Sequence, residues 1–434
     1  MKSKAQGARI YNLFPRLIGR MDNWGVHFDR IRELGFDWVY VNPFHYPGFS
    51  GSLYAPKDYY EFNPLFIDTS SIVPPMKQLE SMLEEAHQRG LRVIMDLVIN
   101  HTAKDHPFTR QHPEWYRRDE KGEVKSPGAW DNGQWIEWGD LAEIDNENAA
   151  DRENLWNYWK ELVLFYIEKG FDGFRADAAY QVPAELWKHL ISAAKQKNKK
   201  TVFFAESLGC TPRQTHELAK SGFEYIFNSS KWWNFTDPWL LEQYNLTKDM
   251  SNSISFPESH DTIRIAMELN NNLNAVKQRT VFSALFSTGW MIPVGYEYGF
   301  RKKLDVIQTF PKDWEPINYD LTDFIRKLNQ IKVSHSVFNE ENDLDIVHTE
   351  NENQLLVLRE RSRDRKESAL LVINKDVSHN QKAIIPDLAA AMECPSDSTV
   401  LDISVEREMS SVPMKNFEYI LNPGEVRILI WKRG

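Results

Sequence analysis

Short apolar runs alternate with longer amphipathic stretches along most of this chain, a pattern typical of parallel strands joined by helices. We predict eight strands, each followed by a helix or by a loop and a helix, at about residues 8–14, 37–44, 91–98, 172–177, 201–206, 224–228, 253–257 and 290–295. Eight such units favour a (β/α)8 TIM barrel. The alternative, an open doubly wound sheet, would usually have a glycine-rich turn after its first strand. Here Tyr11-Asn-Leu-Phe-Pro15 occupies that place.

Two stretches depart from the barrel pattern. Residues 102–148 are rich in His, Pro, Trp, Gly and Asp, and so long a segment between two strands is usually functional. Towards the end of the chain, short apolar strands such as Leu355-Leu-Val-Leu358 are separated by turn residues, which predicts a β-sandwich. We therefore expect a barrel at 1–101 and 149–340, a short insertion after strand 3 at 102–148, and a C-terminal β-sandwich at 341–434.

Charge and cysteine content exclude several classes of function. The formal net charge of −10 and the scattered Lys and Arg residues disfavour a nucleic-acid partner, which requires clustered positive charge. No stretch is long enough to cross a membrane, and no apolar run follows the basic start as in a secretory signal. The two cysteines, Cys210 and Cys394, are far apart in the sequence, as expected for reduced thiols. We expect a cytoplasmic protein with no nucleic-acid or membrane partner.

Polar residues end four of the predicted strands. In a TIM barrel the active site lies at the C-terminal ends of the strands, so these residues are candidates for catalysis. They occur in the segments Asp96–His101, Arg175–Asp177, Phe204–Glu206 and Glu258–Asp261.

Asp177 has an arginine two residues before it, and residues i and i+2 of a strand face the same side. The charge of Arg175 would keep Asp177 ionised, as a nucleophile requires. The alternative is a structural ion pair, which is the usual role of an isolated Arg-x-Asp.

Glu206 has no basic residue within several positions in the sequence. Burial without a cation would raise the pKa of Glu206 and retain its proton, as a general acid requires; the alternative is a solvent-facing glutamate. Two carboxyl groups in opposite protonation states are typical of glycoside hydrolysis, and a separation of about 5–5.5 Å would indicate retention through a covalent intermediate.

His101, His260 and Asp261 could hydrogen-bond sugar hydroxyls as positive charge develops in the transition state. For His101 a purely structural role is the alternative. The spacing of His101 and His106 matches no zinc motif, so zinc hydrolysis is disfavoured. The chain also lacks a Gly-x-Ser-x-Gly elbow and a glycine-rich phosphate loop.

Taken in order, these segments resemble the α-amylase family, glycoside hydrolase family 13. The resemblance covers about residues 8–430, and the segments that carry it are Tyr54-Ala-Pro-Lys-Asp-Tyr-Tyr60, Asp96-Leu-Val-Ile-Asn-His101, Gly173-Phe-Arg-Ala-Asp177, Phe204-Ala-Glu206 and Ser259-His-Asp261. It implies that 102–148 is the family's B domain and that the C-terminal strands are its C domain.

The resemblance also implies a role for each site residue. Asp177 would be the nucleophile, Glu206 the acid/base, and Asp261 the carboxylate that stabilises the transition state. The substrate-binding residues would be Tyr54, His101, Arg175, His260 and Arg264. No cofactor is expected, except that the residue at Asn100 ligates calcium in some relatives.

Within the family, residues 188–233 and Lys312-Asp-Trp314 look most like bacterial maltosyltransferases that use maltose 1-phosphate. Those enzymes have an Asn after the nucleophile and a Lys/Tyr-bearing loop that hold the phosphate. Here Ala178 follows Asp177, and the loop reads Trp135-Ile-Glu-Trp-Gly-Asp-Leu141, so these phosphate-binding residues are missing. The loop suits a neutral glucan, with Trp130, Trp135 or Trp138 as stacking faces.

We therefore expect a retaining hydrolase or transglycosidase that acts on α-1,4-gluco-oligosaccharides through a glycosyl-Asp177 intermediate. The sequence leaves the acceptor open, since exclusion of water depends on loop closure. Two alternatives remain: a maltosyltransferase or phosphorylase with a glycosyl phosphate donor, and a catalytically silent sugar-binding homologue.

Overall fold

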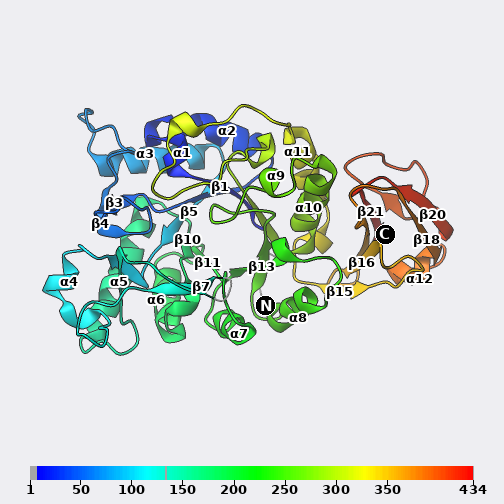
Figure 1. Cartoon of the computed structure of the whole chain (residues 1–434). Helices are drawn as coiled ribbons and strands as arrows, with labels where there is room; N and C mark the ends of the chain where they lie inside the picture. The colour runs from blue at the N-terminus through cyan, green and yellow to red at the C-terminus, as the bar shows by residue number, and fades with distance from the viewer. Residues whose placement is uncertain (1–6, 132–133, 434) are drawn as a thin grey trace. The chain divides into compact units, whose positions relative to one another are not determined.

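The computed structural model describes residues 7–131 and 134–433. Eight parallel strands close into a barrel in the order β1-β14-β13-β12-β11-β10-β5-β2 (Figure 1). Their bounds are β1 Arg9–Leu13, β2 Trp38–Val41, β5 Arg92–Leu97, β10 Gly173–Ala176, β11 Val202–Ala205, β12 Tyr225–Phe227, β13 Asn252–Ser255 and β14 Gly289–Pro293. Each predicted barrel strand is present, so the prediction of a TIM barrel is confirmed.

The chain forms two compact units. The first comprises residues 10–228 and 303–314, and the second comprises the rest of the described chain. These limits differ from the domain boundaries expected at 101, 148 and 340, which stay a prediction.

The helices of the first unit include the long connections of the barrel. They are α1 Pro15–Ile18, η1 Met21–Asn23, α2 Gly25–Glu33, α3 Pro75–Gln88, α4 Phe108–Gln111, η2 Pro113–Trp115, α5 Arg152–Lys169, η3 Ala179–Gln181, α6 Ala184–Lys197, α7 Pro212–Ala219 and η6 Pro311–Asp313. Those of the second unit are η4 Ser230–Trp232, α8 Trp239–Thr247, α9 Ile265–Glu268, α10 Leu273–Phe286, η5 Tyr296–Tyr298, α11 Thr322–Ser334, η7 Ser336–Phe338 and α12 Leu388–Met392.

Local sequence explains the strand and helix that precede the site. In β5 only the first residue, Arg92, is exposed, because a parallel strand is covered on both faces. The helix before it, α3, begins with a proline at its first position and buries Leu79, Met82, Leu83 and Ala86 on one face. Gly90 follows with a φ of 72°, a left-handed conformation that favours glycine after a helix end.

Two hairpin-like segments lie between the barrel elements of the first unit. The first pairs β3 (His45–Pro47) with β4 (Pro56–Phe62). The second is the segment predicted as an insertion, where β6 (His101–Ala103) pairs with β9 (Leu141–Glu143). Within it, β7 (Gly128–Asp131) and β8 (Gln134–Glu137) form an antiparallel pair. His101 therefore lies on a short strand.

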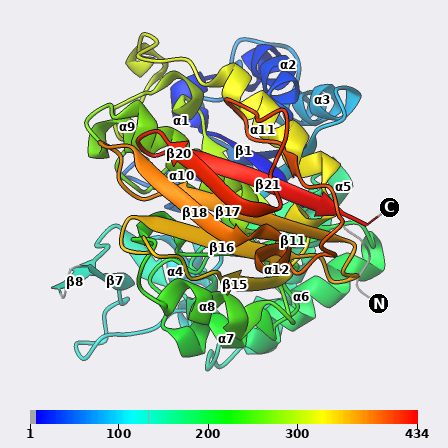
Figure 2. The same ribbon diagram turned by 90° about the vertical axis from the view of Figure 1, so that its right-hand side faces the viewer.

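The C-terminal residues form two antiparallel sheets, as predicted (Figure 2). One has the order β15-β16-β17-β21-β19 and the other pairs β18 with β20. Apolar side chains of both sheets pack in one core that includes Leu370, Val372, Ile385, Phe417 and Leu429. The bounds are β15 Asp343–Ile346, β16 Leu355–Arg361, β17 Glu367–Asn374, β18 Gln381–Asp387, β19 Leu401–Asp402, β20 Lys415–Leu421 and β21 Val426–Lys432.

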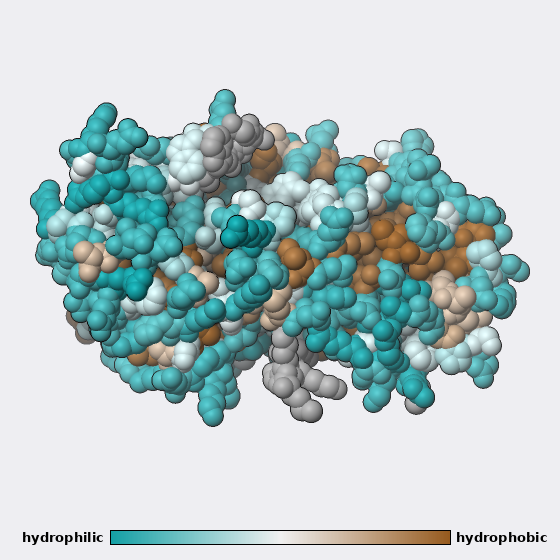
Figure 3. All heavy atoms as spheres, turned by 90° about the horizontal axis from the view of Figure 1, so that it is seen from below, coloured by the Kyte–Doolittle hydropathy of each residue, from teal (hydrophilic) through white to brown (hydrophobic). Residues whose placement is uncertain are grey.

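The surface agrees with the composition. Most of the face seen in Figure 3 is hydrophilic. Among the described residues, no helix combines the length and the apolar character that a membrane span requires.

Candidate active site

Arg175 binds three carboxylates at the C-terminal ends of neighbouring barrel strands. Its Nη1 donates to Asp177 Oδ1 at 2.8 Å and to Asp96 Oδ1 at 2.8 Å, and its Nη2 lies 2.9 Å from Glu206 Oε1. The parallel register explains this: Arg175 is opposite Asp96 on β5 and opposite Phe204 on β11, two residues before Glu206. All four side chains are at most 15% exposed. The two carboxylates that we predicted as the catalytic pair, Asp177 and Glu206, therefore bind the same guanidinium.

The electrostatics of this cluster favour retention of a proton. Three ionised carboxylates around one guanidinium would leave excess negative charge in a buried site. Burial raises the pKa of Asp177 well above its ordinary value, and the neighbouring Glu206 and Asp96 add to the rise, although Arg175 opposes it. Burial would lower the pKa of Arg175, but Asp96 and Glu206 hold it well above its usual range. The guanidinium therefore stays charged.

The structure corrects the sequence argument about these two acids. The prediction that Glu206 lacks a nearby cation is wrong, because Arg175 comes from the adjacent strand. Glu206 also accepts a hydrogen bond from the backbone N–H of Ala178 at 2.7 Å. The expectation that Arg175 keeps Asp177 ionised fails in this geometry, since burial outweighs the ion pair. The two carboxyl groups therefore share the charge of one guanidinium.

Ala178, directly after the predicted nucleophile, has a left-handed backbone with φ 40° and ψ 46°. This conformation is unfavourable for a residue with a Cβ, and such strain often occurs at functional sites. Here it turns the chain so that the Ala178 N–H faces Glu206 Oε2. The turn therefore couples the positions of Asp177 and Glu206.

Tyr54 joins the cluster through its hydroxyl. That hydroxyl donates to Asp96 Oδ2 at 2.6 Å and accepts from Asn42 Nδ2 at 2.9 Å. Tyr40 also donates to Asp96 Oδ2, at 2.5 Å, and Asn42 Oδ1 accepts from Asn12 at 2.7 Å. Three of these residues were not predicted from the sequence: Asn12, Tyr40 and Asn42. They could have been recognised, because they are polar residues at the ends of the first two apolar strands.

His101 holds the backbone of Tyr54. Its Nε2 lies 2.8 Å from the Tyr54 carbonyl oxygen, so Nε2 is the protonated nitrogen. Burial lowers the pKa of His101 to about 4, which leaves the ring neutral at physiological pH. His101 Nδ1 is buried and makes no hydrogen bond within the described residues. The neutral His101 ring therefore positions Tyr54 through its Nε2, and its contact with substrate stays a prediction.

The β7–β8 pair adjoins the segment after Asp177. Gln181 Nε2 donates to the Gly128 carbonyl at 3.4 Å, and Gln181 Oε1 accepts from Asn100 at 3.2 Å. Trp135, on β8, is 47% exposed. Trp138 packs beside a small buried group of Ala55, Ala103 and Leu141. The side chain of Trp130 lies outside the described residues.

The remaining predicted site residues belong to the second compact unit. Asp261 is 40% exposed in its side chain, and its Oδ2 lies 3.0 Å from His260 Nε2. Arg264 is a different case, because it is 1% exposed and binds Glu258 Oε1 at 2.8 Å and two backbone carbonyls. These contacts argue against the predicted contact of Arg264 with substrate. Glu258, which also accepts from the Ile265 N–H, is its structural partner.

Solved structures of α-amylases match the fold over its whole length. A noncanonic maltogenic α-amylase from Thermotoga neapolitana superimposes with a TM-score of 0.77 and 21% identity, covering 99% of this chain and 100% of that one. An α-amylase from Geobacillus thermoleovorans gives a TM-score of 0.79 and 17% identity, covering 99% of both chains.

In sequence, the chain is similar to curated maltosyltransferases. The α-1,4-glucan:maltose-1-phosphate maltosyltransferase of Burkholderia pseudomallei is 24% identical over 397 residues, which covers 88% of this chain and 34% of the relative. The maltosyltransferase of the same name from Myxococcus xanthus is 24% identical over 422 residues, covering 88% of this chain and 61% of the relative. The chain thus spans only part of the length of these relatives.

A family model named as the glucanotransferase domain of glycogen debranching enzyme matches residues 3–120. The solved structures agree with the barrel fold. The chain is thus similar to α-amylase-family proteins in sequence and in fold. The roles of Asp177, Glu206 and Asp261 as the family's three carboxylates stay predictions.

Some α-amylase-family proteins bind calcium at the position of Asn100. Asn100 Oδ1 is buried without a hydrogen-bond donor, so it is an available oxygen ligand. Calcium requires six to eight oxygens, usually with carboxylates among them. Within the described residues, the only convergent group of three acidic or histidine ligands lies elsewhere, at His112, Glu114 and Asp151. Asn100 Oδ1 is thus one available oxygen, and calcium binding at this position stays a prediction.

Proposed function

We propose that this protein is a retaining enzyme that hydrolyses or transfers α-1,4-glucosidic bonds of gluco-oligosaccharides. Asp177 attacks the anomeric carbon, and Glu206 protonates the departing glycosidic oxygen. Asp261 stabilises the oxocarbenium-like transition state, and Tyr54 stacks on the sugar at the cleaved bond. Water or a second sugar then releases the glycosyl group from Asp177.

The observation that carries the proposal is the binding of Asp177 and Glu206 to the two terminal nitrogens of Arg175, at 2.8 and 2.9 Å. Retaining glycosidases hold their two carboxyl groups about 5–5.5 Å apart, and inverting ones about 6.5–9.5 Å apart. Two carboxylates on one guanidinium favour the shorter separation.

The proposal includes a proton transfer on substrate binding. Without substrate, Glu206 forms an ion pair with Arg175 and accepts a hydrogen bond from the Ala178 N–H, and Asp177 has the raised pKa. Catalysis requires the opposite arrangement, with Asp177 ionised and Glu206 protonated. The glycosidic oxygen, as a new acceptor beside Glu206, would draw the shared proton from Asp177 to Glu206.

An unphosphorylated glucan is the proposed donor. Ala178 stands where maltosyltransferases have an Asn that helps to hold the donor phosphate. The backbone N–H of Ala178 already donates to Glu206. The β8 segment presents an indole, Trp135, and the acid Glu137. Neither would attract a phosphate, whereas an exposed indole suits the apolar face of a sugar.

We further propose that the protein acts in the cytoplasm. Cys210 and Cys394 are both free thiols, and reduced cysteines are typical of that compartment. Mass spectrometry of protein from intact cells, alkylated after unfolding without a reductant, would report two modified cysteines if this holds.

The test is incubation with maltoheptaose, with and without inorganic phosphate. Products are separated by chromatography, and the anomer first formed is read by NMR. We expect α-anomeric shorter glucans, or longer ones on transfer, without dependence on phosphate. Asp177→Ala should be inactive, whereas the control Asp172→Asn, at the other end of the β10 strand, should retain activity.

Each rival has a distinct outcome. Sugar phosphate as the product would establish a phosphate-dependent enzyme, and a β-anomeric first product would contradict retention. No turnover of any α-glucan by the wild type would indicate a silent homologue. Unchanged turnover in Asp177→Ala would overturn the assignment of the nucleophile.

A further inference from the structure

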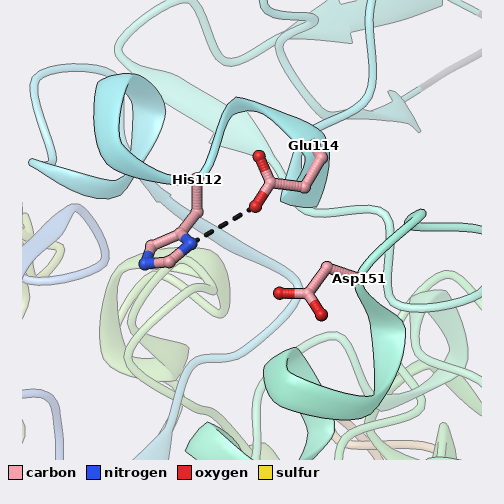
Figure 4. Close-up of side chains that lie close together, drawn as sticks. All are labelled: His112, Glu114 and Asp151. Atoms are coloured by element: carbon pink, nitrogen blue, oxygen red, sulfur yellow. Dashed lines mark hydrogen bonds and ion pairs between the residues drawn. The ribbon is translucent and has the colours of Figure 1, made fainter.

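The side chains of three residues converge at His112, Glu114 and Asp151 (Figure 4). Each offers one ligand atom, and the three atoms lie within 4.8 Å of one another. His112 Nδ1 and Glu114 Oε1 are 3.3 Å apart. Two ligands on a tetrahedral zinc ion, with bonds of about 2.0–2.1 Å, are separated by about 3.3 Å. The two side chains therefore already have the spacing of metal ligands.

Asp151 gives a second, independent indication. It occupies the N-cap of the 18-residue helix α5, where an aspartate usually accepts a backbone N–H of the first turn. Here its side chain makes no such bond. Instead, Trp115 Nε1 donates to Asp151 Oδ2 at 3.3 Å and Asn154 donates to Oδ1 at 2.8 Å. The carboxylate is thus held by Asn154 of its own helix and by Trp115, and it faces His112 and Glu114 (Figure 4).

Residues around the three candidate ligands hold them in place, as the residues that contact metal ligands do in known metal sites. The His112 ring stacks on Trp115 with centroids 4.0 Å apart and an interplanar angle of 10°. Trp115 is 4% exposed, so it forms a rigid support. Among the described residues, neither Glu114 nor Asp151 is paired with a lysine or arginine. His112 Nδ1, 3.3 Å from Glu114 Oε1, is the basic group beside these two carboxylates, and a bound cation would compensate their negative charge.

We propose that His112, Glu114 and Asp151 bind one divalent transition-metal ion of the Zn²⁺ class. An imidazole with two carboxylates suits Zn²⁺ better than Ca²⁺, which prefers six to eight oxygens. The side chains of His112 and Glu114 are 37% and 35% exposed, so water completes the coordination.

The ion has a structural consequence. His112 and Glu114 belong to the insertion, at the end of α4 and in η2, whereas Asp151 begins α5. A bound ion therefore fastens residues 112–115 to the helix that precedes β10 and Asp177. The site is independent of the proposed function, and its test requires no catalytic activity.

The experiment is a calorimetric titration of the chelator-treated full-length protein with ZnCl₂. We expect one equivalent to bind, and Co²⁺ to give the visible absorption of a four- or five-coordinate ion. Glu114→Gln and Asp151→Asn preserve size and should weaken Zn²⁺ binding by at least about tenfold, since even outer-shell partners change metal affinity by about 10- to 100-fold. Limited proteolysis within residues 102–148 should be slower with Zn²⁺.

The matched control is His379→Ala. His379 is also paired with an acid, Asp376, at 3.0 Å, and its side chain is 77% exposed. Zn²⁺ binding should be unchanged in this variant. Equal binding by the wild type, Glu114→Gln and Asp151→Asn, with metal-free melting temperatures that show all three are folded, would overturn the proposal. So would the absence of a Zn²⁺-dependent change in proteolysis.

Discussion

Arg175 Nη2 lies 2.9 Å from Glu206 Oε1, while Nη1 of the same guanidinium contacts Asp177 and Asp96. One cation thus sets the positions and the charge of all three acids. Because Arg175 is 4% exposed, water cannot replace it. Loss of this guanidinium should therefore affect stability and catalysis together.

Arg175→Met leaves buried carboxylates without a cation. We expect the free energy of unfolding to fall by about 3–5 kcal/mol, as for other broken buried ion pairs. We expect kcat to fall by about 10²–10³-fold, because the acids lose their preorganised partner. Urea unfolding and maltoheptaose kinetics measure the two effects.

The control for this prediction is Arg427→Met in the C-terminal sheets. Arg427 and Asp402 form another fully buried pair, at 2.6 Å with side chains 0% exposed. This variant should lose comparable stability but retain kcat. A similar loss of kcat in both variants would mean that Arg175 acts only through stability.

Azide rescue distinguishes the roles of Asp177 and Glu206. In Asp177→Ala, azide can enter the space of the missing carboxylate and attack an activated α-glucosyl donor, which gives a β-glucosyl azide. In Glu206→Ala, Asp177 still forms the intermediate, and azide then yields an α-glucosyl azide. NMR of the products assigns each role, and exchanged anomers would reverse the assignment.

The raised pKa of Asp177 predicts how stability depends on pH. Above its ordinary pKa the unfolded state releases a proton that the native state retains, so the wild type loses stability as pH rises towards the native pKa. Asp177→Asn lacks this loss. We expect its Tm to exceed that of the wild type by about 1 °C at pH 7, which for a chain of 434 residues corresponds to about 1 kcal/mol.

Calorimetry at pH 4 and pH 7 checks this prediction, because the difference in Tm should be smaller at pH 4. Glu185→Gln, in the exposed first turn of α6, is the control and should show no such difference. A difference that grows towards low pH would show that Asp177 is stabilised as the carboxylate.

The eight barrel strands could be predicted because their apolar runs are continuous and separated by clear helical patterns. The site acids could be predicted because they directly follow those runs. The ion pair between Arg175 and Glu206 could not be predicted, because it depends on how β10 is aligned against β11. The sequences of the two strands, taken separately, do not determine that register.

The role of Arg264 shows the same limit. In the sequence it lies close to Asp261, but its side chain turns to Glu258 and to backbone carbonyls. The strand β6 was also missed, because its partner β9 lies about 40 residues away and the segment between them has turn-forming composition. Proximity in sequence and local propensity do not determine such contacts.

His101 predicts a second dependence on pH, with the opposite sign. Its pKa in the folded protein is about 4, below the ordinary 6.5. Between these values the unfolded state binds a proton that the native state excludes, so the wild type loses stability as pH falls from 6.5 towards 4. His101→Gln keeps an N–H donor for the Tyr54 carbonyl but does not titrate. We expect the loss of unfolding free energy between pH 8 and pH 5 to be about 2 kcal/mol smaller in His101→Gln. Urea unfolding at both pH values measures it, and an equal loss in both proteins would show that His101 is protonated in the native state.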